Sequence, residues 1–110
     1  MPERPHLREI LELERSLLKQ LCSKASRLRG SALSELAGYD WQDREHQVVY
    51  EALLKVRVHQ SESLRKILPV QATRMGFPDV AWEIYFAPED SPPDLERLIL
   101  ELKTAQARLP

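Results

Sequence analysis

The sequence predicts an all-α, single-domain bundle of about five or six helices. Apolar residues recur along it at three- and four-residue intervals, which is the spacing of one helical face. Residues typical of helix starts and stops separate these stretches. A length of 110 residues with 43% hydrophobic residues suits one domain, spanning residues 1–110, with a core of its own.

The first helix is predicted from Pro5 to about Leu28. Pro5 suits a first-turn position, because the N–H that proline lacks would have no partner there. Gly30 is expected to end the helix in a left-handed conformation. The predicted buried face consists of Leu7, Ile10, Leu11, Leu17, Leu18, Leu21, Cys22, Ala25 and Leu28.

Two shorter helices are predicted to follow. Ser31 is expected to cap the second helix, which ends at Gly38. Asp40 or Asp43 is expected to cap the third, which runs through Val56.

A fourth helix is predicted to begin at Ser61 or Ser63 and to end or kink near Pro69. A further turn or two through Met75 is the alternative, with Gly76 as the exit.

The last helix is predicted over about residues 92–109. Ser91 is expected to cap it, with Pro92 in the first turn and Asp94 at a position that favours an acid. Its predicted buried stripe consists of Leu95, Leu98, Ile99, Leu102 and Ala105.

Two segments contain residues that also suit strands. Lys55–His59 alternates in polarity, and Val80–Phe86 is rich in aromatic and branched side chains. A lone strand would have nothing to pair with elsewhere in the chain. We therefore predict no strand, and expect Val80–Phe86 to form a short helix or a turn-rich segment.

Composition bounds the class of protein. The single cysteine, Cys22, excludes an internal disulfide and a thiolate-rich zinc cluster. A formal net charge of −1 provides no general attraction to nucleic acid or anionic lipid. There is neither an apolar run of about 20 residues nor the apolar stretch of a secretory signal. We expect a cytoplasmic protein without membrane contact.

Motifs that would indicate an enzyme are absent from the sequence. It has no glycine-rich phosphate loop, nucleophile elbow, HExxH motif or paired-cysteine pattern. Glu45 and His46 are adjacent on a predicted helix with Glu51 nearby, but adjacent residues point to different faces. We expect no catalytic residue, cofactor or metal ligand.

Two surfaces are candidates for binding. One is a basic stretch that could hold a phosphate backbone or an acidic partner, although a solvated helix face is the favoured explanation. It consists of Arg15, Lys19, Lys24, Arg27 and Arg29. The other is an aromatic cluster that would form a hot spot for a protein partner if exposed, with core packing as the favoured alternative. It includes Phe77, Trp82, Tyr85 and Phe86.

The segment Leu13–Val56 carries three consecutive patterns: Leu-Glu-Arg-Ser-Leu-Leu-Lys-Gln-Leu, Ala-Leu-Ser-Glu-Leu-Ala-Gly-Tyr-Asp-Trp, and Gln-Asp-Arg-Glu-His-Gln-Val-Val-Tyr-Glu-Ala-Leu. It resembles the opening of the N-terminal domain of DnaB-type replicative helicases, and is similar to the helicase-binding C-terminal domain of DnaG-type primases. The segment Leu68–Phe86 has no counterpart in this resemblance. The matching residues are Glu14, Leu17, Leu18, Leu21, Tyr39, Trp41, His46, Val49, Tyr50, Ala52 and Leu53.

The resemblance implies protein–protein contact, such as helicase–primase binding or collar-type self-association, and no catalysis. The expected function is thus a non-enzymatic interaction module, associated with DNA replication, that binds a replicative helicase, a primase or a second copy of itself as a homodimer. The alternatives are a nucleic-acid-binding helical domain using the basic stretch, and a purely structural domain.

Overall fold

The computed structural model describes residues 5–23, 26–56, 61–87 and 94–107. These residues form six helices and no strand, so the predicted all-α bundle is confirmed. The helices are α1 (Pro5–Ser23), α2 (Ser26–Glu35), α3 (Arg44–Lys55), α4 (Ser61–Arg74), α5 (Trp82–Tyr85) and α6 (Leu95–Gln106).

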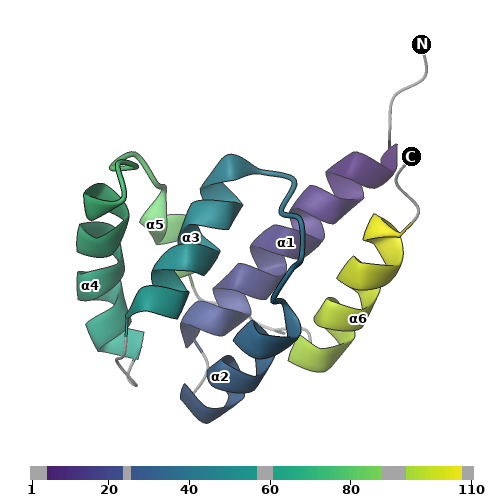
Figure 1. The fold of residues 1–110 in the computed structure, drawn as a ribbon, viewed down its shortest axis with the longest axis horizontal. Helices are drawn as coiled ribbons and strands as arrows, with labels where there is room; N and C mark the ends of the chain where they lie inside the picture. The colour runs from purple at the N-terminus through teal and green to yellow at the C-terminus, as the bar shows by residue number, and fades with distance from the viewer. Residues whose placement is uncertain (1–4, 24–25, 57–60, 88–93, 108–110) are drawn as a thin grey trace.

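Helix α1 is the centre of the bundle and contacts each of the other five helices. In Figure 1, α3 and α4 lie to one side of α1, α6 lies beside it on the other, and α2 crosses one end. The predicted apolar face explains this position, because its central residues lose all solvent contact. These residues are Ile10, Leu17, Leu18, Leu21 and Cys22.

The first predicted boundary is wrong. Helix α1 ends at Ser23 rather than near Leu28, and α2 begins at Ser26 rather than at Ser31. Gly30 therefore lies inside α2 and does not stop a helix. A glycine inside a helix costs only about 1 kcal/mol relative to alanine, which the burial of neighbouring α2 residues offsets. The buried residues of this segment are Ala32, Leu33 and Leu36.

The predicted exits at Gly38 and Gly76 have the expected left-handed backbone, with φ of 83° and 87°. Helix α4 begins at Ser61 and does not end at Pro69, since it continues to Arg74. Lys55 is the last residue of α3 and Val56 is its C-cap, and the remaining residues of the alternating segment, 57–59, lie outside the described residues.

Asp94, and not Ser91, is the N-cap of α6, and the helix spans 95–106 rather than 92–109. The Asp94 carboxylate accepts a hydrogen bond from the Arg97 backbone N–H (3.3 Å). A start at Pro92 would require an α conformation just before Pro93, which proline disfavours in the preceding residue. Residues 88–93 themselves lie outside the described residues.

Residues Val80–Phe86 contain the short helix α5 and no strand, as predicted. Among the residues that the structure describes, no helix has both the length and the apolar character needed to cross a bilayer.

Candidate functional site

A buried carboxylate joins three parts of the chain. Glu14 of α1 is completely shielded from solvent. Its Oε2 accepts hydrogen bonds from the Tyr39 hydroxyl (2.6 Å) and from the Gln42 backbone N–H (2.9 Å). Its Oε1 lies 2.8 Å from Nδ1 of His46 on α3. The carboxylate therefore holds the connector between α2 and α3 against the central helix.

Glu14 and His46 form the buried centre of this network, while Tyr39 and Gln42 are partly exposed. His46 is buried like Glu14, and burial raises the pKa of the Tyr39 hydroxyl, an effect to which the hydrogen bond and charge of Glu14 add. Both carboxylate oxygens already have partners within the protein. This arrangement satisfies a buried charge and stabilises the fold.

The connector also carries a row of aromatic rings. Trp41 packs edge-on against Tyr39 with ring centroids 4.9 Å apart, and lies 5.2 Å from the ring of Tyr50. The Tyr50 hydroxyl donates to the Leu33 carbonyl oxygen (3.0 Å), which ties α3 to α2. The Trp41 Nε1 is buried without a hydrogen-bond partner among the described residues.

A second polar contact attaches α5 to α3. The Tyr85 hydroxyl donates to Oε2 of Glu45 (2.7 Å), and its ring meets His46 edge-on at 6.4 Å. Burial raises the pKa of Tyr85, and the hydrogen bond to Glu45 adds to the rise. Tyr85, which the sequence placed in a candidate binding cluster, is thus a core residue that is 2% exposed.

An open groove lies between α4 and α5. It encloses about 330 Å³ and is lined by Arg65, Trp82, Glu83 and Phe86. The Arg65 guanidinium carbon lies 5.4 Å from the Phe86 ring centroid, and Nη2 donates to the Phe86 carbonyl oxygen (3.3 Å). The groove thus combines two partly exposed aromatic rings with one cation and one carboxylate.

The structure separates the residues of the predicted aromatic cluster. Trp82 and Phe86 lie in the groove with ring centroids 6.4 Å apart. Phe77 is partly buried and packs against the core. Sequence reasoning missed Arg65 and Glu83, and no pattern in the sequence connects Arg65 to a segment 21 residues further along the chain.

The predicted basic stretch is described only in part. Arg15 is exposed and Lys19 is half-buried on α1. The side chains of Lys24, Arg27 and Arg29 lie outside the described part of the structure. Nucleic-acid binding through this stretch stays a prediction.

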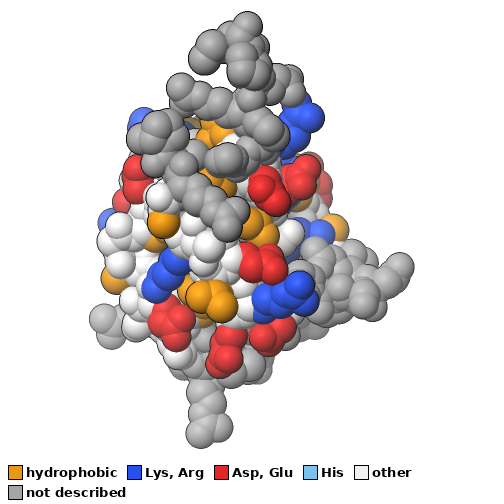
Figure 2. Space-filling view, turned by 90° about the vertical axis from the view of Figure 1, so that its right-hand side faces the viewer, with side chains coloured by type: hydrophobic (Ala, Val, Ile, Leu, Met, Phe, Trp, Pro, Cys, Tyr) orange, Lys and Arg blue, Asp and Glu red, His pale blue; other side chains and the backbone are white. Residues whose placement is uncertain are grey.

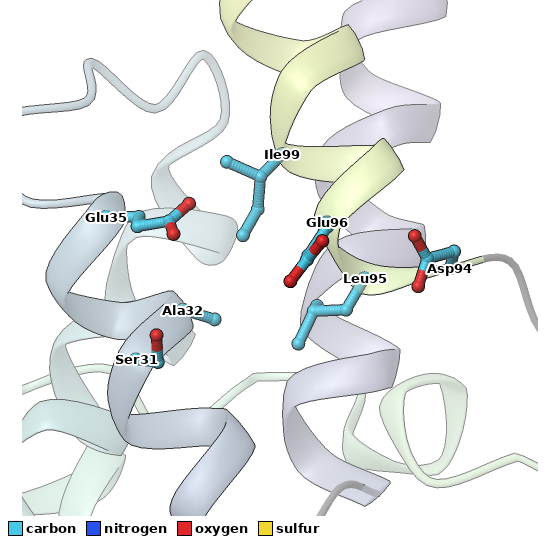
Figure 3. Close-up of a pocket in the computed structure, with 7 residues that line it drawn as sticks. All are labelled: Ser31, Ala32, Glu35, Asp94, Leu95, Glu96 and Ile99. Atoms are coloured by element: carbon cyan, nitrogen blue, oxygen red, sulfur yellow. The ribbon is translucent and has the colours of Figure 1, made fainter.

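A smaller pocket of about 140 Å³ lies between α2 and the start of α6. Figure 3 shows Ala32 on one side and Leu95 and Ile99 on the other, with the carboxylates of Glu35 and Glu96 nearby. Ser31 and Asp94 are further described residues of the lining. Acids in the first turn of a helix compensate its dipole, which accounts for Glu96.

The described residues contain no cluster of histidine, cysteine or acidic side chains suited to hold a metal ion. The face seen in Figure 2, on the side of α6, mixes acidic and basic side chains with scattered hydrophobic ones. The described side chains on this face therefore give no strong attraction to one sign of charge.

We found no match to this chain among known protein families, curated proteins or solved structures.

Proposed function

We propose that this chain is a non-enzymatic protein-interaction module whose groove between α4 and α5 binds a segment of a partner protein. The carrying observation is that Trp82 and Phe86 stand partly exposed beside each other in a groove of about 330 Å³. Ligand pockets typically measure roughly 300–1,000 Å³. Tryptophan is among the residues that contribute most to binding at protein interfaces.

The lining of the groove fits a peptide segment that presents an aliphatic or aromatic side chain. The two rings provide apolar surface for that side chain. Arg65 provides hydrogen-bond donors and Glu83 provides acceptors, which suits the carbonyl and N–H groups of a peptide backbone. Among the described lining residues, Arg65 carries a positive charge and Glu83 a negative one, so recognition through shape and apolar contact is favoured over a strongly charged ligand.

The partners that we propose to test first are a DnaB-type replicative helicase, a DnaG-type primase and a second copy of this chain. Their choice rests on the resemblance of residues 13–56, and the groove does not itself select among them. The described residues that line the groove are Arg65 and three residues of the segment Leu68–Phe86. All of them lie outside that resemblance. The groove and the partner's identity are therefore tested separately.

The test is capture of purified helicase and primase by the full chain, with light scattering after size exclusion to measure self-association. We expect one of these partners to bind. Trp82→Ala should weaken that binding roughly 30-fold, the size of a typical hot-spot loss of about 2 kcal/mol.

Leu100→Ala is the matched control, because Leu100 is 67% exposed on α6 and does not line the groove. It should leave binding unchanged. Circular dichroism of both variants should show the helical spectrum of the folded wild type. A strict monomer that captures neither protein would contradict the proposed partners, and equal binding by Trp82→Ala and Leu100→Ala would contradict the proposed groove.

A further inference from the structure

Helix α5 has little stability of its own. It comprises four residues, and its N-cap, Ala81, makes no side-chain hydrogen bond. Its turn is supported by backbone hydrogen bonds from Ile84 to Ala81 (3.1 Å) and from Phe86 to Trp82 (3.2 Å). A single helical turn is unstable in water, since nucleation fixes several residues for few hydrogen bonds. Its geometry must therefore be imposed by contacts with the rest of the bundle.

Tyr85 provides the central contact. Within α5, whose residues are all described, it is the one buried side chain. Its hydroxyl donates to Glu45 in the first turn of α3, at 2.7 Å. Along the chain, Tyr85 stands between the groove residues Trp82 and Phe86. Any rotation of α5 about Tyr85 would move both aromatic rings and change the shape of the groove.

We propose that the hydrogen bond between Tyr85 and Glu45 is a latch that holds α5 in the orientation that forms the groove. Tyr85 and Glu45 are then positioning residues for the bound partner, since neither lines the groove. That consequence rests on the proposed function, whereas the latch itself is a property of the free protein.

A second contact closes the other end of α5 but is weaker. Arg65 donates to the Phe86 carbonyl oxygen at 3.3 Å, with an exposed side chain on α4. Both hydrogen bonds include one charged group, but the Arg65 bond is longer and exposed, so water competes for its partners, whereas the Tyr85 bond is shorter and partly buried. Of these two polar contacts, the Tyr85–Glu45 hydrogen bond is therefore expected to be the stronger, and it adds to the packing of α5 against α1.

The test is amide hydrogen exchange of the full-length chain, followed by NMR residue by residue. Tyr85→Phe should accelerate exchange of the Ile84 and Phe86 amides about tenfold more than exchange of amides in the middle of α1, because the loss of a bond to a charged acceptor is of this size. Glu45→Gln, which keeps a neutral acceptor, should give a smaller acceleration. If Tyr85→Phe fails to fold, Glu45→Gln tests the latch in its place.

Tyr50→Phe is the matched control. It removes a tyrosine hydroxyl that donates to the Leu33 carbonyl oxygen between α3 and α2. It should lower the stability of the whole domain without an added acceleration at Ile84 and Phe86. The latch is wrong if Tyr85→Phe accelerates α5 and α1 amides by the same factor, or if Tyr50→Phe affects α5 equally.

Binding then separates the two proposals. The affinity is measured for the partner that the wild type captures, whether the helicase, the primase or a second copy of the chain. Tyr85→Phe should weaken the affinity for that partner several-fold. If Trp82→Ala abolishes capture and Tyr85→Phe leaves it unchanged, the groove is correct and the positioning role is wrong. If no protein is captured, the proposed function fails, while the exchange experiment still decides the latch.

Discussion

Glu14 and Glu12 differ at the residue scale although they lie two positions apart on one helix. Glu12 is exposed, whereas Glu14 is buried and bonded to Tyr39, Gln42 and His46. A buried carboxylate is costly unless it is hydrogen-bonded, and both oxygens of Glu14 have partners. Removing the Glu14 carboxylate would lower the stability of the fold, because the groups bonded to it would lose their partner.

Glu14→Ala should lower the free energy of unfolding by about 3 kcal/mol, because the Tyr39 hydroxyl, the Gln42 N–H and His46 would lose their acceptor. Urea denaturation followed by circular dichroism measures the change. Glu12→Ala is the control and should stay within about 0.5 kcal/mol of the wild type. Equal effects of the two substitutions would show that the network contributes nothing to stability.

At the scale of elements, helices α3 and α6 begin where the short acidic side chains of Asp43 and Asp94 accept backbone N–H groups. Asp43 caps α3, and its Oδ1 accepts from Glu45 N–H at 2.8 Å and from His46 N–H at 3.4 Å. Asp94 caps α6 through a single longer contact with the Arg97 N–H, at 3.3 Å. The two caps provide the same chemistry with different geometry, so they allow a direct comparison.

Asp43→Ala should lower stability by about 1–2 kcal/mol, and Asp94→Ala by less than 1 kcal/mol, because the shorter and doubled contacts belong to Asp43. Thermal or urea unfolding of both variants provides the comparison. Asp43→Ser retains a capping oxygen and should restore most of the loss. A larger effect at Asp94 than at Asp43 would show that cap geometry does not determine these energies.

At the scale of the whole molecule, three tyrosine hydroxyls tie separate parts of the bundle together. Tyr39 is bonded to α1, Tyr50 to α2 and Tyr85 to α3. The pKa of each is raised above that of a free tyrosine, with burial as the first cause. In the folded protein these three tyrosine side chains therefore stay neutral to a higher pH than a free tyrosine does.

Stability should therefore fall steeply above pH 10. There the unfolded chain releases its phenolic protons while the folded chain retains them, so the unfolded state binds fewer protons and raising the pH favours it. Below pH 9 the tyrosines contribute no pH dependence. Urea unfolding between pH 9 and 11.5, with phenolate absorbance measured in parallel, tests this.

Tyr50→Phe should reduce the steepness of the alkaline loss by removing one of the three groups. Phenolate absorbance should appear together with unfolding in the wild type. Ionisation of all three tyrosines near pH 10 in a protein that remains folded would contradict this prediction.

Local signals predicted most of the fold. The spacing of Leu17, Leu18 and Leu21 specifies which face of the first helix is buried, and Asp43 is recognisable as one of two caps for α3. Gly38 and Gly76 adopt the left-handed conformation expected of helix exits. These features depend on residues within a few positions of one another, so the sequence expresses them directly.

Helix boundaries and the groove were less predictable. Gly30 suggested a stop, but packing of the residues around it keeps α2 continuous through that position. The hydrogen bond between Arg65 and Phe86 joins residues 21 positions apart in the sequence, and the contact between His46 and Glu14 joins residues 32 positions apart. No local preference encodes such pairs, because many partners of the same chemical type are available to each side chain.

The sequence by itself determined that this chain forms amphipathic helices around a leucine-rich core, because helical periodicity and hydrophobic burial act on near neighbours. Only the tertiary structure decided which polar residues are buried with partners and which aromatic residues remain at the surface. In the folded chain Glu14 and Tyr85 are buried, while Trp82 and Phe86 line a groove with Arg65. These outcomes depend on how helices distant in the chain pack, and burial is decided by that packing alone.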